Sequence, residues 1–75
     1  MSKVEVTSDV TGNVWKIETK VGDHVNEEDV LMIMESMKME IPIEAECAGT
    51  VTEILVKEED AVEEDQIVAI IESDG

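Results

Sequence analysis

Several residue types are scarce in this 75-residue chain, and their scarcity excludes whole classes of protein. Cys47 is the one cysteine, so no internal disulfide can form, and a lone thiol is typical of a reducing compartment. No apolar run is long enough to span a membrane. The amino terminus lacks the charged-then-apolar layout of a secretory signal. We therefore expect a cytoplasmic protein with no membrane association.

Basic side chains are also scarce. Five lysines and no arginine stand against 20 acidic residues, which gives a formal net charge of −15. Such a polyanion gains nothing from displacing counterions on nucleic acid, so nucleic-acid binding is not expected, and anionic lipid surfaces are disfavoured for the same reason. Three interpretations of the acidity stay open: a solvated surface, attraction to basic faces of partner enzymes, and adaptation to high salt.

The size allows one domain, residues 1–75, with a thin core, since a chain this short buries only about 60% of its unfolded surface. Trp15 is the only aromatic residue; core packing is its default role, and the alternative is contact with a partner from the face of a sheet. Cys47 is expected to be a small buried or half-buried residue without catalytic context. His24 has no neighbouring cluster with the spacing of metal ligands, so we expect no metal site.

The strongest structural signal is an internal repeat. With a shift of 37 positions, residues 12–36 fall on residues 49–73 without a gap, and ten of the 25 positions are identical. Gly12 matches Gly49, and both are expected to mark turns that lead into long strands. The register extends backward, so the repeat halves cover about residues 4–36 and 41–73.

Each copy favours strands over helices. Valine, isoleucine and threonine dominate, and the apolar residues either alternate with polar ones or form runs of about five. Four strands per copy predict an all-β fold, in which two interlocked copies form a sandwich or a flattened barrel. The expected strands are residues 3–7, 13–20, 24–26, 30–35, 39–45, 50–57, 61–63 and 67–72.

The repeat also makes a prediction about Lys38, which lies at the junction between the two copies. Adding 37 to its number gives Gly75, the carboxyl end. If a pseudo-two-fold axis relates the copies, the junction hairpin maps onto the chain ends. Lys38 should therefore lie on a projecting turn at the end of the molecule opposite the termini.

The segment Glu35-Ser36-Met37-Lys38-Met39-Glu40-Ile41-Pro42-Ile43, followed by Ala48-Gly49-Thr50-Val51, resembles the attachment signature of the biotinyl/lipoyl carrier family. The resemblance covers nearly the whole chain. It implies a flattened barrel of two four-stranded antiparallel sheets, with the lysine at a hairpin tip. It also implies that a biotin protein ligase joins biotin to Lys38 through an amide.

The residues beside the lysine distinguish the two cofactors of this family. Relatives that carry lipoate typically have Asp-Lys-Ala, whereas this chain has methionine on both sides of Lys38, which favours biotin. Ser36 replaces the alanine that is most common in the motif. The residues that the ligase would recognise are the rest of the motif: Glu35, Ser36, Met37, Met39 and Glu40.

Three functions remain open. The first is a non-catalytic biotin carrier that shuttles carboxyl groups between the biotin carboxylase and carboxyltransferase subunits of a biotin-dependent carboxylase, and that is a monomer in isolation. The second is a lipoyl carrier, or a carrier of either cofactor, for a 2-oxo acid dehydrogenase or glycine-cleavage type system. The third is an unmodified β-sandwich binding module. The methionines disfavour the second function, and an exposed Lys38 disfavours the third.

The chain departs from the family pattern in two respects. The gapless repeat leaves no room for the thumb-like insertion that some bacterial biotin carriers have. Glu28, Glu59 and Asp65 stand where relatives often have glycine. If those turns require φ > 0, each carboxylate residue costs roughly 1 kcal/mol there.

Overall fold

The computed structural model describes residues 2–74 and consists of eight antiparallel strands joined by turns. Strands, in order, are β1 (Lys3–Thr7), β2 (Gly12–Ile17), β3 (His24–Val25), β4 (Val30–Ser36), β5 (Met39–Glu44), β6 (Gly49–Ile54), β7 (Ala61–Val62) and β8 (Ile67–Ser73). Their number and order match the sequence prediction. The all-β class and the two four-stranded sheets are likewise confirmed, in the form of a sandwich.

The second strand of each copy is shorter than predicted. Strands were expected over residues 13–20 and 50–57, but β2 ends at Ile17 and β6 ends at Ile54. Beyond these points the chain turns, because the Lys20 N–H donates to the Asp23 carboxylate at 3.0 Å and the Lys57 N–H donates to Asp60 at 2.9 Å. Short acidic side chains that bond to the backbone in this way compete with sheet pairing.

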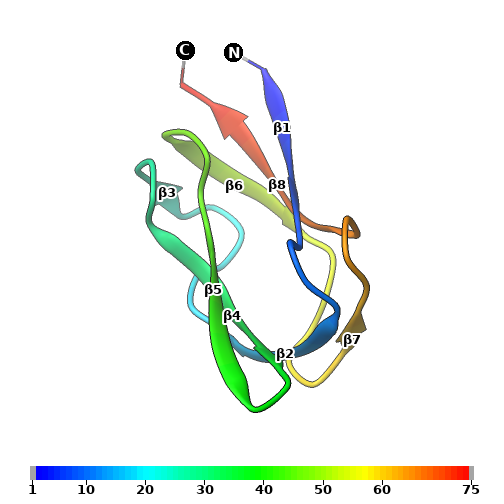
Figure 1. Ribbon diagram of the computed structural model, residues 1–75. Helices are drawn as coiled ribbons and strands as arrows, with labels where there is room; N and C mark the ends of the chain where they lie inside the picture. The colour runs from blue at the N-terminus through cyan, green and yellow to red at the C-terminus, as the bar shows by residue number, and fades with distance from the viewer. Residues whose placement is uncertain (1, 75) are drawn as a thin grey trace.

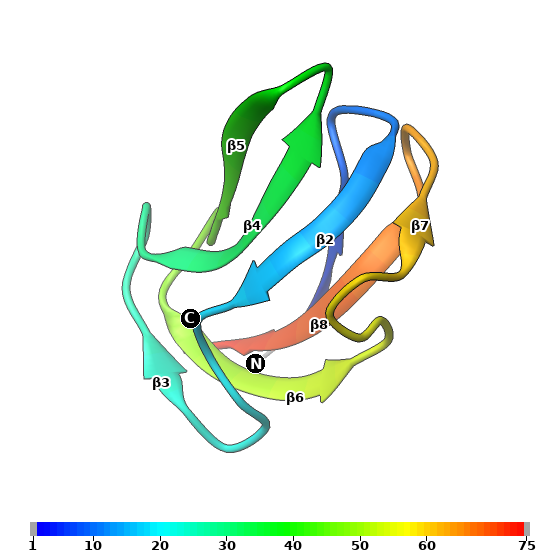
Figure 2. The ribbon, with the colours of Figure 1, turned by 90° about the horizontal axis from the view of Figure 1, so that it is seen from below.

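The two sheets are related by the sequence repeat. One sheet has the strand order β1-β8-β6-β3 and the other has β5-β4-β2-β7. Adding four to strand numbers up to four, and subtracting four from the larger ones, converts one order into the other. Each sheet thus takes strands from both copies, and Figures 1 and 2 show the two layers facing each other. Neither copy can form its sheet alone, which explains why the repeat is interlocked.

The register of pairing repeats as well. Asn13 pairs with Glu35, and the equivalent Thr50 pairs with Glu72. A β-bulge follows Val14 in β2, and another follows the equivalent residue in β6. A bulge adds one unpaired residue to a strand and bends it. The shared bulges show that the two copies agree in detail and not only in topology.

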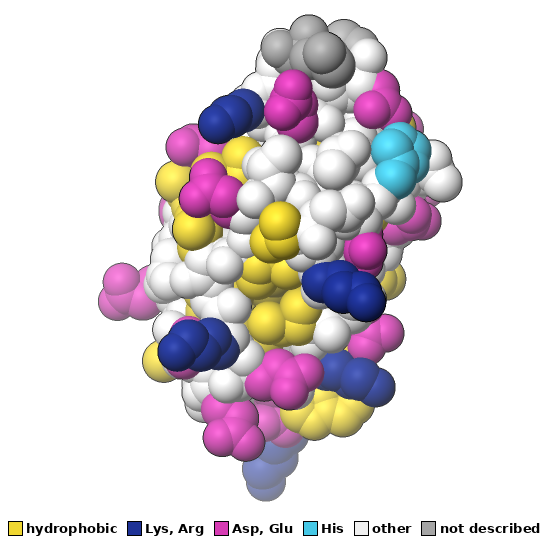
Figure 3. Space-filling view, turned by 180° about the vertical axis from the view of Figure 1, so that it is seen from behind, with side chains coloured by type: hydrophobic (Ala, Val, Ile, Leu, Met, Phe, Trp, Pro, Cys, Tyr) yellow, Lys and Arg dark blue, Asp and Glu magenta, His cyan; other side chains and the backbone are white. Residues whose placement is uncertain are grey.

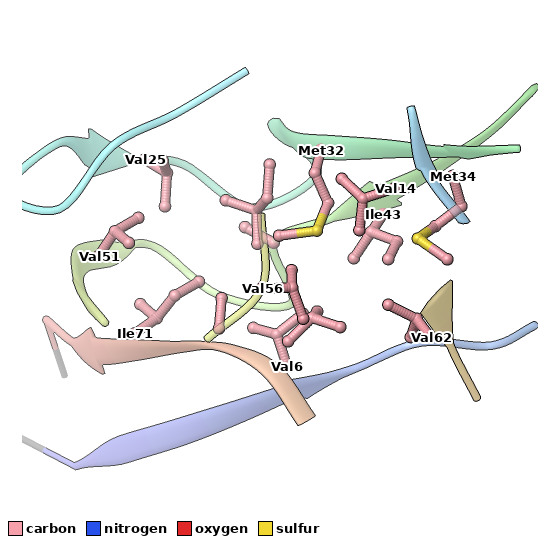
Figure 4. Packing of buried hydrophobic residues seen from close by; sticks show 14 residues of the cluster. Val6, Val14, Val25, Met32, Met34, Ile43, Val51, Val56, Val62 and Ile71 are labelled. Carbon is pink, nitrogen blue, oxygen red and sulfur yellow. The ribbon is translucent and has the colours of Figure 1, made fainter. Parts of the chain in front are cut away.

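The core lies between the sheets (Figure 4). It consists of valine, isoleucine, leucine, methionine and alanine side chains from both copies, and Met32 and Met34 are fully buried. Trp15 does not belong to it: 48% of the residue is exposed, so the expectation of core packing was wrong. The preceding residue, Val14, enters the core, so the alternation of the strand directs Trp15 to the outer face, where the bulge leaves it unpaired.

The molecule is elongated, with extents of 36 × 18 × 17 Å. The hairpin between β4 and β5 lies at one end, and the start of β1 lies beside the end of β8 at the other (Figure 1). This is the arrangement that the pseudo-two-fold axis predicts.

The three carboxylate residues that stand where relatives often have glycine all adopt positive φ. Glu28 and Asp65 are equivalent in the repeat and have φ of 75° and 70°. Glu59 has φ of 75°, and its equivalent in the first copy is Gly22, with φ of 99°. The equivalent turns at Glu28 and Asp65 are therefore strained alike. The turn at Gly22 is free of this strain, whereas its equivalent at Glu59 is strained.

Charged side chains are spread over the surface, and on the face shown in Figure 3 the acidic groups are interspersed with apolar and neutral ones. His24 Nε2 lies 2.8 Å from Asp74 Oδ2, and Lys16 forms an exposed pair with Glu18. Within residues 2–74 no three His, Cys, Asp or Glu side chains are grouped so that they could hold a metal ion. The described chain also contains no helix of the length and hydropathy that crossing a membrane would require.

Candidate functional site

Lys38 lies in the two-residue turn that joins β4 to β5. Ser36 and Met39 are the last paired residues, and Met37 and Lys38 between them have φ of 51° and 65°. Positive φ at both central residues defines the type I′ turn, whose twist suits a tight hairpin. Asparagine and glycine normally occupy these positions, so methionine and lysine keep a conformation that costs free energy. The chain therefore holds Lys38 at the tip of a short, well-defined hairpin.

The tip is exposed. Met37 is 92% exposed, Met39 is 60% exposed, and Lys38 is exposed as well. Methionine side chains that are mostly in contact with water bury little apolar surface, so Met37 and Met39 contribute little to folding. Among the described residues, no hydrogen bond or ion pair engages the Lys38 amine. The amine is thus available to a reaction partner from outside.

The base of the hairpin is fixed to the rest of the sheet. The Ser36 hydroxyl donates to the Thr11 carbonyl at 2.8 Å. A Cβ atom added to Gly12 would lie 2.3 Å from the Glu35 carbonyl oxygen, so only glycine permits this approach of β2 to β4. Gly12 and Gly49 were expected to mark turns; instead each is the first residue of a strand that passes very close to its neighbour.

A second set of contacts holds Thr11 in place. Its hydroxyl accepts a hydrogen bond from the Glu64 N–H at 3.1 Å. The Asp65 N–H donates to the Ser8 carbonyl at 2.8 Å, and the fully buried Ser8 hydroxyl donates to the Val10 carbonyl at 2.6 Å. Sequence reasoning missed both Ser8 and Thr11, because hydroxyl residues in a loop carry no signal of their long-range partners.

Two motif carboxylates lie beneath the tip. Glu35 and Glu40 are directly opposite each other on β4 and β5, and both are exposed. Like charges at such a position destabilise a sheet. The equivalent pair in the other copy is Glu72 with Lys3, which have opposite charges. At the hairpin end this pair therefore carries two negative charges, whereas the charges of the equivalent pair at the opposite end cancel.

This geometry suits covalent attachment. A primary amine that is exposed, unpaired and mounted on a rigid turn can be acylated by another protein, because its backbone position is fixed while the side chain is free. The Lys38 amine thus suits a cofactor that is attached through an amide bond. The structure brings all six motif residues, Glu35 to Glu40, onto one hairpin.

The comparisons with known proteins agree on the type of domain. The family model described as "Biotin-requiring enzyme" matches residues 4–71. A biotin/lipoyl attachment protein of Bacillus subtilis is 46% identical over 46 residues, which cover 61% of this chain and 63% of that protein. A biotin carboxyl carrier protein of Streptococcus mutans is 51% identical over 41 residues, 55% of this chain and 32% of its own length.

Solved structures show the same fold in larger proteins. The urea carboxylase of Kluyveromyces lactis superposes with a TM-score of 0.90 and 39% identity, covering 95% of this chain and 6% of that one. A multi-domain long-chain acyl-CoA carboxylase gives a TM-score of 0.89 at 18% identity, which shows the shared fold alone. The chain spans less than two thirds of each of these four proteins. With its family model matched over residues 4–71, the chain belongs to the biotin/lipoyl attachment domain family, and the family description and the carrier relatives support covalent biotin as its cofactor.

Proposed function

We propose that this protein is a biotin carrier that receives biotin on Lys38 and serves a biotin-dependent carboxylase. The observation that carries the proposal is the exposed, unpaired Lys38 amine between two exposed methionines at the tip of a fixed hairpin. The carrier is non-catalytic. Bound biotin supplies a ring nitrogen that can hold a carboxyl group, and the active sites lie on partner proteins.

The residues of this chain then have positioning roles. Gly12 and Ser36 fix the base of the hairpin, so the position of the amine is set by the sheet. The long side chain that results from attachment reaches beyond the tip in several directions. Tethering turns delivery between two active sites into a local event, with an effective concentration of about millimolar.

We infer that a biotin protein ligase recognises the motif residues Glu35, Ser36, Met37, Met39 and Glu40. Met37 and Met39 offer apolar contacts on either side of the amine, and flexible methionines adapt well to a partner surface. The two carboxylates attract a basic face and speed encounter. Biotin carboxylase and carboxyltransferase subunits are the further partners that the carboxylase relatives support. We place the protein in the cytoplasm, where its free Cys47 stays reduced.

Lipoate is the second candidate cofactor. The Bacillus relative is described as a biotin/lipoyl attachment protein, and an exposed lysine on a hairpin tip suits either acyl group. The protein would then act in a 2-oxo acid dehydrogenase or glycine-cleavage type system. The two methionines support biotin over lipoate.

The intact mass of the protein purified from its native host tests the proposal, beside Lys38→Arg and the control Lys16→Arg. Lys16 is an exposed lysine on the neighbouring strand β2 and keeps its charge in the control. We expect a biotinyl increment in the wild type and in Lys16→Arg and none in Lys38→Arg. A lipoyl increment, or one that survives Lys38→Arg, would contradict the proposal.

A further inference from the structure

A shallow groove lies on the outer face of the sheet that carries the hairpin. It has a volume of about 530 Å³ and is lined by Asn13, Val14, Trp15, Glu35 and Glu59. Asn13 and Glu35 are paired across β2 and β4, and Trp15 is the bulge residue that points away from the core. The groove therefore combines the Trp15 indole with one amide and two carboxylates. One of its lining residues, Glu35, is three residues along the chain from Lys38.

The wall formed by Glu59 is rigid. Its N–H donates to the Val14 carbonyl at 2.7 Å, and the Val14 N–H donates to the Asp60 carbonyl at 2.9 Å. The turn is closed by the Lys57 N–H bond to the Asp60 carboxylate at 2.9 Å. The groove is thus preformed by the backbone of β2 and of the turn that follows β6.

The equivalent surface of the other copy keeps the backbone bonds, and Val51 and Glu72 match Val14 and Glu35, but its other three lining residues differ. Thr50 stands in place of Asn13, Thr52 in place of Trp15, and Gly22 in place of Glu59. Glutamate at position 59 keeps a positive φ that the glycine in the equivalent turn adopts freely. In a molecule whose two halves agree in strand order, register and bulge, these differences single out one surface, and it is the surface beside Lys38.

We propose that this groove docks the bicyclic ureido ring of the biotin carried by Lys38, with the Trp15 indole packed against the ring. This inference rests on the proposed function for the identity of the cofactor. A ureido group has two N–H donors and one carbonyl acceptor. The Asn13 amide can donate to the carbonyl, and the Glu35 carboxylate can accept from an N–H.

The cofactor can reach the groove. Glu35 and Lys38 are three residues apart, so their Cα atoms are separated by at most about 11 Å. The lysine side chain and the acyl chain of biotin together place the ring about eleven bonds from the Lys38 Cα, on the order of 14 Å. The two carboxylates would repel a ring that carries an additional negative charge, so the groove holds the uncharged ring and releases the carboxylated one.

Trp15 provides the readout. It is the only tryptophan, and the chain has no tyrosine or phenylalanine, so its emission reports on this groove alone. We compare acrylamide quenching of Trp15 in the unmodified and the fully biotinylated protein, with the extent of modification taken from the intact mass. Because 48% of Trp15 is exposed and one face of the ring becomes covered, quenching is expected to fall roughly twofold on biotinylation.

Asn13→Ala and Thr50→Ala form a matched pair of variants, because these residues occupy equivalent positions in the two copies. We expect Asn13→Ala to lose the protection of Trp15 and Thr50→Ala to keep it, with both variants folded by circular dichroism. Nuclear Overhauser contacts between the indole protons and the bicyclic ring should appear in the biotinylated wild type and weaken in Asn13→Ala.

Two results would overturn the inference. One is equal quenching of the unmodified and fully biotinylated wild type, and the other is protection that survives Asn13→Ala. Failure of the proposed function is a separate outcome, since the intact mass would then show no biotin on Lys38 before any quenching is measured.

Discussion

At one end of the molecule a strained hairpin presents Lys38, while at the equivalent end of the other copy β1 and β8 lie side by side. There the Ser73 N–H donates to the Ser2 carbonyl, and Lys3 faces Glu72 with opposite charge. At the hairpin end Glu35 faces Glu40 with like charge, and two non-glycine residues have positive φ. What the copies share is therefore the sandwich, and what distinguishes the hairpin end costs stability, as is typical of a functional site.

The largest effect should come from the two glycines that the copies share. Gly12→Ala and Gly49→Ala each place a Cβ within 2.3 Å of a neighbouring carbonyl oxygen, at Glu35 and Glu72 respectively. We expect each substitution to lower the free energy of unfolding by about 2–3 kcal/mol, measured by urea denaturation. Only Gly12→Ala moves the base of the hairpin, so it alone should slow biotinylation by the ligase at a temperature where both variants are folded. Equal slowing in both variants would mean that the ligase senses global stability only.

The Gly22 and Glu59 turns can be exchanged, with a smaller effect. Glu59→Gly relieves a positive φ and should raise the free energy of unfolding by about 1 kcal/mol, while Gly22→Glu should lower it by about the same amount. No atom lies within 4 Å of a Cβ built on Gly22, so its cost is one of backbone conformation alone. Thermal unfolding followed by circular dichroism measures both. A loss of stability in Glu59→Gly would show that its side chain contributes more than the strain costs.

Most of the fold could be predicted from the sequence, because the repeat fixed the strand count and the exposed position of Lys38. The ends of β2 and β6 were harder, since Asp23 and Asp60 end the strands through bonds to the backbone that the valine-rich pattern does not reveal. Trp15 was predicted wrongly because a large apolar side chain favours the core by default, whereas here its neighbour Val14 enters the core and the alternation of β2 directs Trp15 outward. The bond from Ser36 to Thr11 spans 25 residues, and no local pattern encodes such a contact.

Ser36→Ala separates the effect of Ser36 on the stability of the hairpin from its effect on biotinylation of Lys38. The substitution removes the hydrogen bond to the Thr11 carbonyl, and an exposed bond of this kind stabilises by about 0.5–1 kcal/mol. We expect that loss in urea denaturation. Biotinylation should continue, because alanine is the common residue at this position of the motif. A protein that is stable but no longer modified would show that the ligase requires the Ser36 hydroxyl itself.

The smallest effect should come from exchanging the charge pairs of the two ends. Glu40→Lys gives the hairpin end the opposite-charge arrangement of Lys3 with Glu72, and the exposed pair should add roughly 0.2–0.5 kcal/mol to the free energy of unfolding. Lys3→Glu is the matched control, and it should lose a similar amount. If the Glu35–Glu40 pair attracts a basic face of the ligase, Glu40→Lys should slow biotinylation at low salt, and the difference should shrink as salt screens the charges, while Lys3→Glu leaves the rate unchanged. Equal rates for wild type and Glu40→Lys at low salt would show that the like-charge pair has no part in ligase encounter.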